Sequence, residues 1–156
     1  MSGASPPATM IDLAFRLAFA TAVGAAVGLN RQLAGKPAGL RTHALVSLGA
    51  AAGVLTAIIA GGDPAAASRV SQGVLAGVGF IGGGVILHDR RNIHGLPTAA
   101  TIWVVAAAGL AAGTGLWATA SLVAILALLV LVVGHWIDRA LEQRLGKRLR
   151  RARDPD

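Results

Sequence analysis

The sequence contains no cysteine and no tyrosine, and only seven of its 156 residues are aspartate or glutamate. Without cysteine, disulfides, thiolate chemistry and cysteine-ligated metals are excluded, and cysteine usage says nothing about the compartment. Charged residues make up 13% of the chain and hydrophobic residues 54%. With a mean hydropathy of +0.66, this composition is too apolar for a soluble globular domain and indicates a membrane protein.

Long uncharged runs predict where the chain crosses the bilayer. A spanning helix needs roughly 20 residues, and the apolar runs at 10–29, 41–61 and 70–87 are of about that length. No charged residue occurs in the 40 residues from 97 to 136. As one helix this stretch would measure about 60 Å, twice the roughly 30 Å hydrocarbon core, so it must cross twice. Glycine suits a tight turn, and we expect the break at Gly113-Thr114-Gly115. The sequence therefore predicts an all-α membrane protein with five transmembrane helices.

The basic residues predict the orientation. Twelve of the fourteen Lys and Arg residues fall at 31–41, at 90–91 and in the tail from 139 to 153. With five spans these segments share one side, and the positive-inside rule makes that side the cytoplasm, with the N-terminus outside. The formal net charge of +7 is thereby explained by topology and by anionic lipid, and we expect no nucleic-acid binding.

Three regions follow from this organisation. We expect a short external leader at 1–9, a transmembrane domain at 10–136 and a basic amphipathic cytoplasmic tail at 137–156 that lies on the inner leaflet or extends as a solvated helix. A secretory signal cleaved near Ala20-Thr21-Ala22 is the alternative for the first run. The absence of a basic n-region and the presence of Asp12 and Arg16 argue against that alternative.

One stretch recurs along the chain. GLRTHALVSLGAAAG at 39–53 matches GLPTAATIWVVAAAG at 95–109 at eight positions with a constant offset of 56. The shared Gly-Leu-x-Thr-x-Ala start carries most of the signal, because the later matches are largely alanines. Spans one and two therefore resemble spans three and four in the same direction, which predicts a parallel repeat about an axis along the membrane normal.

Glycines four residues apart allow close helix packing in lipid. The first four spans carry this spacing and the fifth does not, so we expect four closely packed helices and a peripheral fifth. The pairs are Gly24/Gly28, Gly49/Gly53, Gly73/Gly77, Gly79/Gly83 and Gly109/Gly113. Of these, we expect Gly49, Gly53, Gly79 and Gly83 to be packing positions whose replacement by Leu breaks the bundle.

The cytoplasmic ends of the repeats bring polar residues together. They are Arg31, Lys36, Arg41 and His43 in the first repeat and Arg90, His94 and Thr98 in the second. One interpretation is structural: threonines cap helix starts and arginines set topology. The other is a basic pocket for an anion, a lipid headgroup or an acidic segment of a partner. Arg41 lies just inside an apolar run, so we expect a counter-charge, either Asp89 or a bound anion.

Other chemistry finds little support in the residues. Asp12 is the one carboxylate within a span, and Arg16 one turn away favours an ion pair over a cation or proton step. No metal site or cofactor is expected. The serines and histidines have no acidic partner at a catalytic spacing, so we expect no enzyme.

Three ordered motifs resemble the membrane domain of the MgtC/SapB family. They are GLNRQLAGKPAGLRTHALVSLGAA, GVLAGVGFIGGGVIL and GLPTAATIWVVAAAG, within about 16–136. The resemblance implies a bacterial inner-membrane protein linked to growth at low magnesium and to survival inside host cells. It also implies functional positions at Arg31, Lys36, Gly39, Arg41, Thr42, His43, Gln72, Gly79 to Gly84, Gly95, Thr98, Thr101 and Trp103.

Two departures limit what the resemblance implies. Asn30 stands where the family usually has an acidic residue, and the soluble C-terminal domain of larger members is absent beyond the basic tail. Two function classes stay open. The first is a small membrane regulator that binds another membrane protein, a second copy of itself or an anionic lipid. The second is a small transporter or channel for Mg²⁺ or protons, favoured by the repeat and by Asp12, Gln72 and Thr101.

Overall fold

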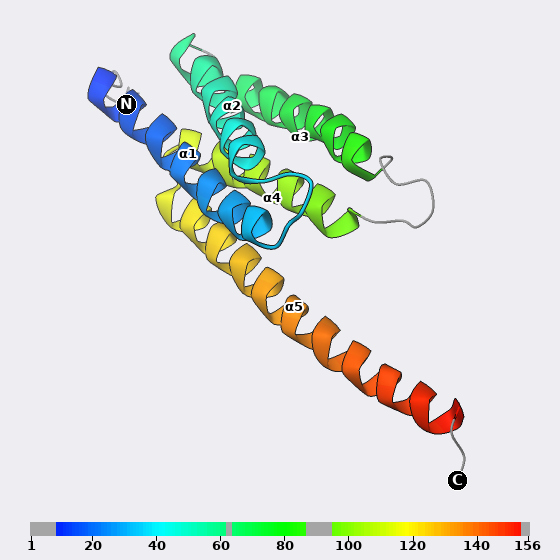
Figure 1. Cartoon of the computed structure of the whole chain (residues 1–156). Coiled ribbons are helices and arrows are strands. Elements are labelled where there is room, and N and C mark those ends of the chain that lie inside the picture. Colours follow the sequence, from blue (N-terminus) through cyan, green and yellow to red (C-terminus); the bar gives the residue numbers. More distant parts are fainter. Residues whose placement is uncertain (1–8, 62–63, 87–94, 154–156) are drawn as a thin grey trace.

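The computed structural model describes residues 9–61, 64–86 and 95–153, with the backbone alone beyond residue 140. These residues form five helices and no strand, and all five helices are long and apolar enough to cross a membrane. The helices are α1 (Met10–Leu33), α2 (Leu40–Ile59), α3 (Pro64–Ile86), α4 (Leu96–Gly113) and α5 (Trp117–Arg153). The all-α fold with five spanning helices is thus confirmed (Figure 1).

The long uncharged stretch crosses twice, as predicted. Helix α4 ends at Gly113 and α5 begins at Trp117. Between them Gly115 has φ +82°, a left-handed conformation that residues with a Cβ rarely adopt. The turn therefore falls in the expected Gly-Thr-Gly segment because glycine alone adopts that backbone at little cost.

The helices pack around α4, which contacts the other four (Figure 1). Helix α1 packs against α2 and α4, and α3 packs against the same two helices. Exchanging α1 with α3 and α2 with α4 leaves this pattern unchanged, as a parallel repeat requires. Among the described helices, α5 packs on α4 and α1 only, which leaves one side of it uncovered by the other described helices.

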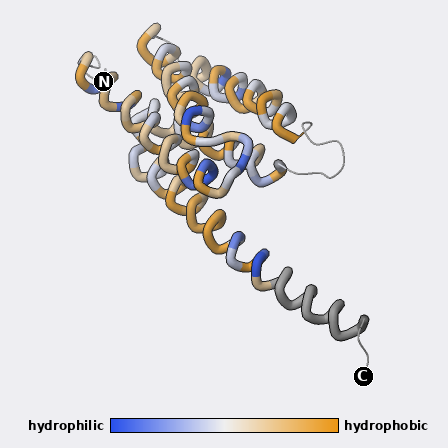
Figure 2. The backbone as a smooth tube through the Cα atoms, in the orientation of Figure 1, coloured by the Kyte–Doolittle hydropathy of each residue, from blue (hydrophilic) through white to orange (hydrophobic). Residues whose placement is uncertain are grey.

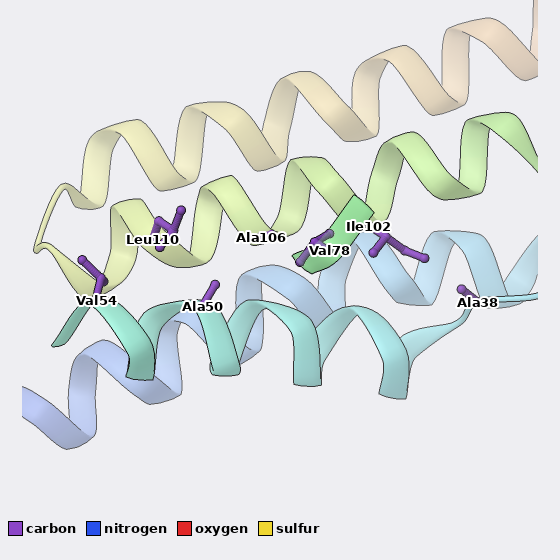
Figure 3. Packing of buried hydrophobic residues seen from close by; sticks show 7 residues of the cluster. All are labelled: Ala38, Ala50, Val54, Val78, Ile102, Ala106 and Leu110. Atoms are coloured by element: carbon purple, nitrogen blue, oxygen red, sulfur yellow. The ribbon is translucent and has the colours of Figure 1, made fainter. Parts of the chain in front are cut away.

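Small and β-branched side chains fill the interior. Figure 3 shows one cluster, in which Ala50 and Val54 of α2 face Ile102, Ala106 and Leu110 of α4. Alanine contributes little volume, so helix backbones approach closely where it faces a neighbour. Buried residues of α2 therefore pack between α1 and α4.

The glycines that hold this packing differ from the four singled out above. A Cβ placed on Gly49, Gly79 or Gly83 would meet no atom within 4 Å, and on Gly53 it would make only ordinary contacts at 3.5 Å and beyond. These glycines therefore do not mediate close approach within the described chain, and the effect of replacing them by Leu stays a prediction. All faces of a helix rich in alanine and glycine carry similar small apolar residues. The glycine spacing alone therefore did not identify which face is buried.

Four other glycines from the same set of pairs mediate the close contacts. A Cβ on Gly24 or Gly109 would overlap the main chain of α2 at His43 or Ser47, and a Cβ on Gly28 would lie 2.7 Å from the Gly39 carbonyl oxygen. Gly113 lies as close to α2, at Ala51 and Val54; a Cβ there would be 2.7 Å from the Ala51 oxygen. Helix α2 is therefore held between glycine faces of α1 and α4. Helix α3 is not held in this way.

Helix α5 continues without interruption into the basic tail. Its backbone is helical to Arg153 and leaves the bundle in a straight line (Figure 1). Figure 2 shows that its hydrophobic part gives way to hydrophilic residues near the C-terminal end of its coloured portion. The amphipathic character expected of the tail depends on side chains beyond residue 140, which lie outside the described ones.

Candidate functional site

A buried arginine joins the end of α1 to the start of α4. Arg31 lies in the last turn of α1, where the helix dipole favours a cation, and its side chain is only 5% exposed. Its Nη2 donates a hydrogen bond of 2.9 Å to Oγ1 of Thr98, in the first turn of α4. Its Nε is also buried but has no hydrogen-bond partner in the described chain. An ion pair between Arg16 and Asp12 lies elsewhere in the bundle.

His43 connects α2 to the same turn of α4. The ring is fully buried, with Nδ1 2.9 Å from the Gly39 carbonyl oxygen and Nε2 2.9 Å from Oγ1 of Thr101. The Thr101 hydroxyl also lies 2.8 Å from the Thr98 carbonyl oxygen. Arg31, Thr98, Thr101 and His43 thus form one buried chain of polar contacts, hereafter the buried polar network.

The acceptors fix where the protons lie in this network. A carbonyl oxygen only accepts, so Nδ1 of His43 must carry a proton. In the neutral ring Nε2 is then an acceptor, and the Thr101 hydroxyl donates a hydrogen bond to it. In the imidazolium form Nε2 donates to Thr101, whose hydroxyl proton turns to the Thr98 carbonyl. One hydroxyl hydrogen therefore distinguishes the two protonation states of His43.

Two helices begin at this site without an acidic side chain to offset the positive end of the helix dipole. Helices α2 and α4 begin after Gly39 and Gly95, which cannot cap them with a side chain, and neither helix has an acidic residue in its first turn. At the start of α2 the Leu40 N–H donates 3.2 Å to Oε1 of Gln32. Gly95 has φ +93°, which only glycine adopts readily. A helix N-terminus carries a partial positive charge and exposed amide donors that suit an anion. Together with Arg31, these two starts make this end of the bundle electropositive.

The structure gathers only part of the set expected from the sequence. Arg31, His43, Thr98 and Thr101 come together. Lys36 and Arg41 are exposed, Thr42 and Trp103 lie outside the network, and Gln72 is exposed on α3 with its one contact to Ser68 at 3.4 Å. Asp89, Arg90 and His94 lie outside the described residues.

Ser47 is a buried polar residue that the sequence did not single out. It lies one turn along α2 from His43, and its hydroxyl donates 2.7 Å to the Ala20 carbonyl oxygen of α1. The sequence signal that could have identified Ser47 is a small hydroxyl residue in an otherwise apolar helix, next to a helix with a Gly-x-x-x-Gly pair. Ser47 extends the polar contacts of α2 to the middle of α1.

The opposite end of the bundle carries a separate polar contact. Arg16 Nε forms an ion pair of 2.9 Å with Asp12, and Nη1 donates 3.1 Å to the Gly113 carbonyl oxygen at the C-terminus of α4. The ion pair expected between Asp12 and Arg16 is therefore confirmed. Within the described residues, no group of three His, Asp or Glu side chains could hold a metal ion.

These features define a helical membrane protein with a buried cationic network at one end. Residues 17–140 match the MgtC family, and the chain belongs to that family. It is 48% identical over 125 residues to protein SrpB of Synechococcus elongatus, covering 72% of this chain and 69% of that one.

Two further relatives are longer than the matched region. The chain is 42% identical over 134 residues to the putative magnesium transporter YhiD of Escherichia coli, covering 80% of this chain and 61% of the relative. It is 42% identical over 100 residues to protein MgtC of Brucella abortus, covering 64% and 42%. No solved structure matches the chain significantly.

Proposed function

We propose that this protein is a small regulator of a bacterial inner membrane, linked to magnesium limitation, that binds an anionic group of a ligand or membrane partner at its cytoplasmic end. Membership of the MgtC family and the name of the YhiD relative support the link to magnesium. The buried polar network supports the binding of an anion.

The unpaired guanidinium of Arg31 is the observation that carries this proposal. Arginines within membrane helices are costly to bury, so they usually have a partner. In the described chain Arg31 has one neutral partner, Thr98, and a buried Nε–H that donates to nothing. A carboxylate or phosphate oxygen would accept from Nε while the uncapped start of α4 adds its own positive potential.

The experiment is complementation of a deletion strain at limiting magnesium, at matched membrane abundance. We expect Arg31→Ala to lose rescue and Arg31→Lys to rescue poorly, because a lysine offers a point charge and cannot reproduce the planar donor fork. Arg41→Ala is the matched control, since Arg41 is exposed at the same end of the bundle. Full rescue by Arg31→Ala would reject the network as a binding site.

The alternative is a small transporter or channel, which the name of the YhiD relative favours. Purified protein in liposomes loaded with a Mg²⁺ or proton indicator separates the two functions. Flux above that of empty liposomes, reduced by Arg31→Ala, would support transport. A regulator leaves flux at the background level while Arg31→Ala still fails in complementation.

A further inference from the structure

An apolar groove between α2 and α3 is not used by the function proposed above. It has a volume of about 400 Å³, and its lining includes Gly49 of α2 and Gly77 and Ile81 of α3. A Cβ placed on Gly49 or Gly77 would meet no atom within 4 Å. The described chain therefore leaves this groove open.

The repeat relates the groove to another surface of the same chain. Residues of α2 correspond to residues of α4 at the offset of 56. A Cβ on Gly28 of α1 would lie 2.8 Å from the side chain of His43 in α2. A Cβ on Gly82 of α3 would lie 3.5 Å from Ala99 in α4, and Ala99 follows His43 by 56 residues. Gly28 and Gly82 therefore occupy equivalent places, which sets an offset of 54 between α1 and α3.

The surface of α1 and α4 that corresponds to the groove is covered by α5. Three valines, Val23, Val27 and Val105, belong there to one buried cluster with Ala124 of α5. By the two offsets, the counterparts of these valines are three exposed residues that line the groove: Gly77, Ile81 and Gly49. The groove is therefore the repeat-related equivalent of the surface on which α5 packs.

The direction of α5 limits which helix can cover the groove. Helix α5 runs parallel to α1 and antiparallel to α4 (Figure 1). In a parallel repeat, the equivalent helix runs parallel to α3 and antiparallel to α2. All five spans of the described chain already belong to its own bundle, so this helix comes from another molecule. In a second copy with the same orientation, α1, α3 and α5 run in the required direction, and α1 is packed against α2, α4 and α5 of its own bundle.

Between α3 and α5 of a second copy, closure of the assembly favours α3. The groove and α5 lie on opposite sides of the bundle (Figure 1), so α5 in the groove of the next copy would produce an open-ended row. Helix α3 both lines one groove and can fill the groove of its partner, which closes the assembly as a two-fold dimer.

The exposed surface of α3 suits contact with a second α3. Gly73, Gly77 and Gly84 lie within about 40° of one another around the helix. A Cβ on any of the three would meet no atom within 4 Å, and Phe80 beside them is 88% exposed. In lipid, small residues on facing helices allow the close backbone approach that drives association.

We propose that the protein forms a two-fold dimer in the membrane, in which α3 of each copy lies in the groove between α2 and α3 of the other. The two α3 helices are parallel and meet near Gly77. The interface contains no residue of the buried polar network. A failure of the dimer would therefore leave the proposed function standing, and the two can be tested separately.

The test uses introduced cysteines, because the chain has none of its own. Membranes that contain Gly77→Cys are oxidised and run on a non-reducing gel. We expect a disulfide-linked dimer, since the two-fold axis brings the two copies of residue 77 together. Ala76→Cys is the matched control, because Ala76 is also exposed on α3 but lies about 100° further round the helix. This variant should stay monomeric on the gel.

Native mass spectrometry of the full chain after release from nanodiscs gives a second measurement. The parent should be released as two copies. Gly77→Leu should raise the dissociation constant of the dimer roughly tenfold or more, as overpacking a close contact does. Ala76→Leu should leave the dissociation constant unchanged. Because a Cβ at residue 77 meets no atom of its own chain, Gly77→Leu should still accumulate in the membrane.

Two outcomes would overturn the proposal. The first is a parent released only as a monomer together with no disulfide in Gly77→Cys, which would leave the groove to lipid or to a helix of another protein. The second is a disulfide that forms only between Gly77→Cys and Leu129→Cys in membranes that hold both variants. Leu129 is exposed on α5, so that disulfide would place α5 of a second copy in the groove.

Discussion

At the scale of single residues, the buried polar side chains of α2 lie where its main chain comes close to the neighbouring helices. His43 and Ser47 lie one turn apart on α2, and the same turn of main chain is pressed against Gly24 of α1 and Gly109 of α4. Glycine at those positions removes the side chain that would hold the helices apart. The short helix separation then lets Ser47 reach the Ala20 carbonyl and lets His43 reach Thr101.

This packing gives the first prediction. Gly109→Ala places a Cβ against the main chain of Ser47, so α4 must move away from α2 and we expect a loss of about 1–3 kcal/mol of stability, as for overpacked cores. The measurement is the melting temperature in detergent together with the amount of protein in membranes. Gly83→Ala is the control, because a Cβ there meets nothing within 4 Å. Equal melting temperatures for the two variants would contradict the packing described.

The same contacts show what the sequence could and could not predict. Hydropathy and length predicted the five helices, because each helix that spans a bilayer needs a long apolar run. The glycines at 113 and 115 showed where the longest run divides into two helices. The face that each helix buries could not be predicted, since runs of alanine and glycine offer no contrast between faces. Arg41 and His43 illustrate this: they are about 200° apart on α2, and only His43 points inward. Arg31, which precedes the matching stretch at 39–53, is the buried arginine at this end, whereas Arg41 is exposed.

At the scale of helices, α1 holds α4 at both ends. Arg16 donates to the Gly113 carbonyl at the C-terminus of α4, and Arg31 donates to Thr98 in its first turn. The helices are antiparallel, and both pairs of positions are 15 residues apart, about 22 Å along the axis. The two arginines therefore fix the register of α1 against α4.

The second prediction concerns the Arg16 end of this register. Arg16→Leu removes the ion pair with Asp12, the bond to Gly113 and the approach of the guanidinium to Trp117, whose ring centre is 5.9 Å away. Asp12→Asn removes the ion pair alone, which for a partly exposed pair contributes about 1 kcal/mol or less. We expect Arg16→Leu to lower the melting temperature more than Asp12→Asn. The reverse order would show that the contact with the C-terminus of α4 adds nothing.

At the scale of the whole molecule, the two polar ends differ in kind. The Arg16 end is satisfied, because its guanidinium has a carboxylate, a helix C-terminus and an indole ring as partners. At the Arg31 end the guanidinium is buried with one neutral partner and an unused Nε–H in the described chain. The contacts of the first end favour a role in stabilising the fold, whereas the second is the end at which we propose that an external anionic group binds.

The third prediction is the orientation of these ends in the membrane. The starts of α2 and α4, Arg31 and the basic tail all lie at the end of the bundle from which α5 leaves, opposite the start of α1 (Figure 1). The positive-inside rule then places the Arg31 end and the tail in the cytoplasm and Thr9 outside. A reporter active only in the cytoplasm should be active when fused after Arg153 and inactive after Gly61, which follows α2. Activity after Gly61 alone would reverse the orientation and put the electropositive site on the outer face, where a cytoplasmic partner could not reach it.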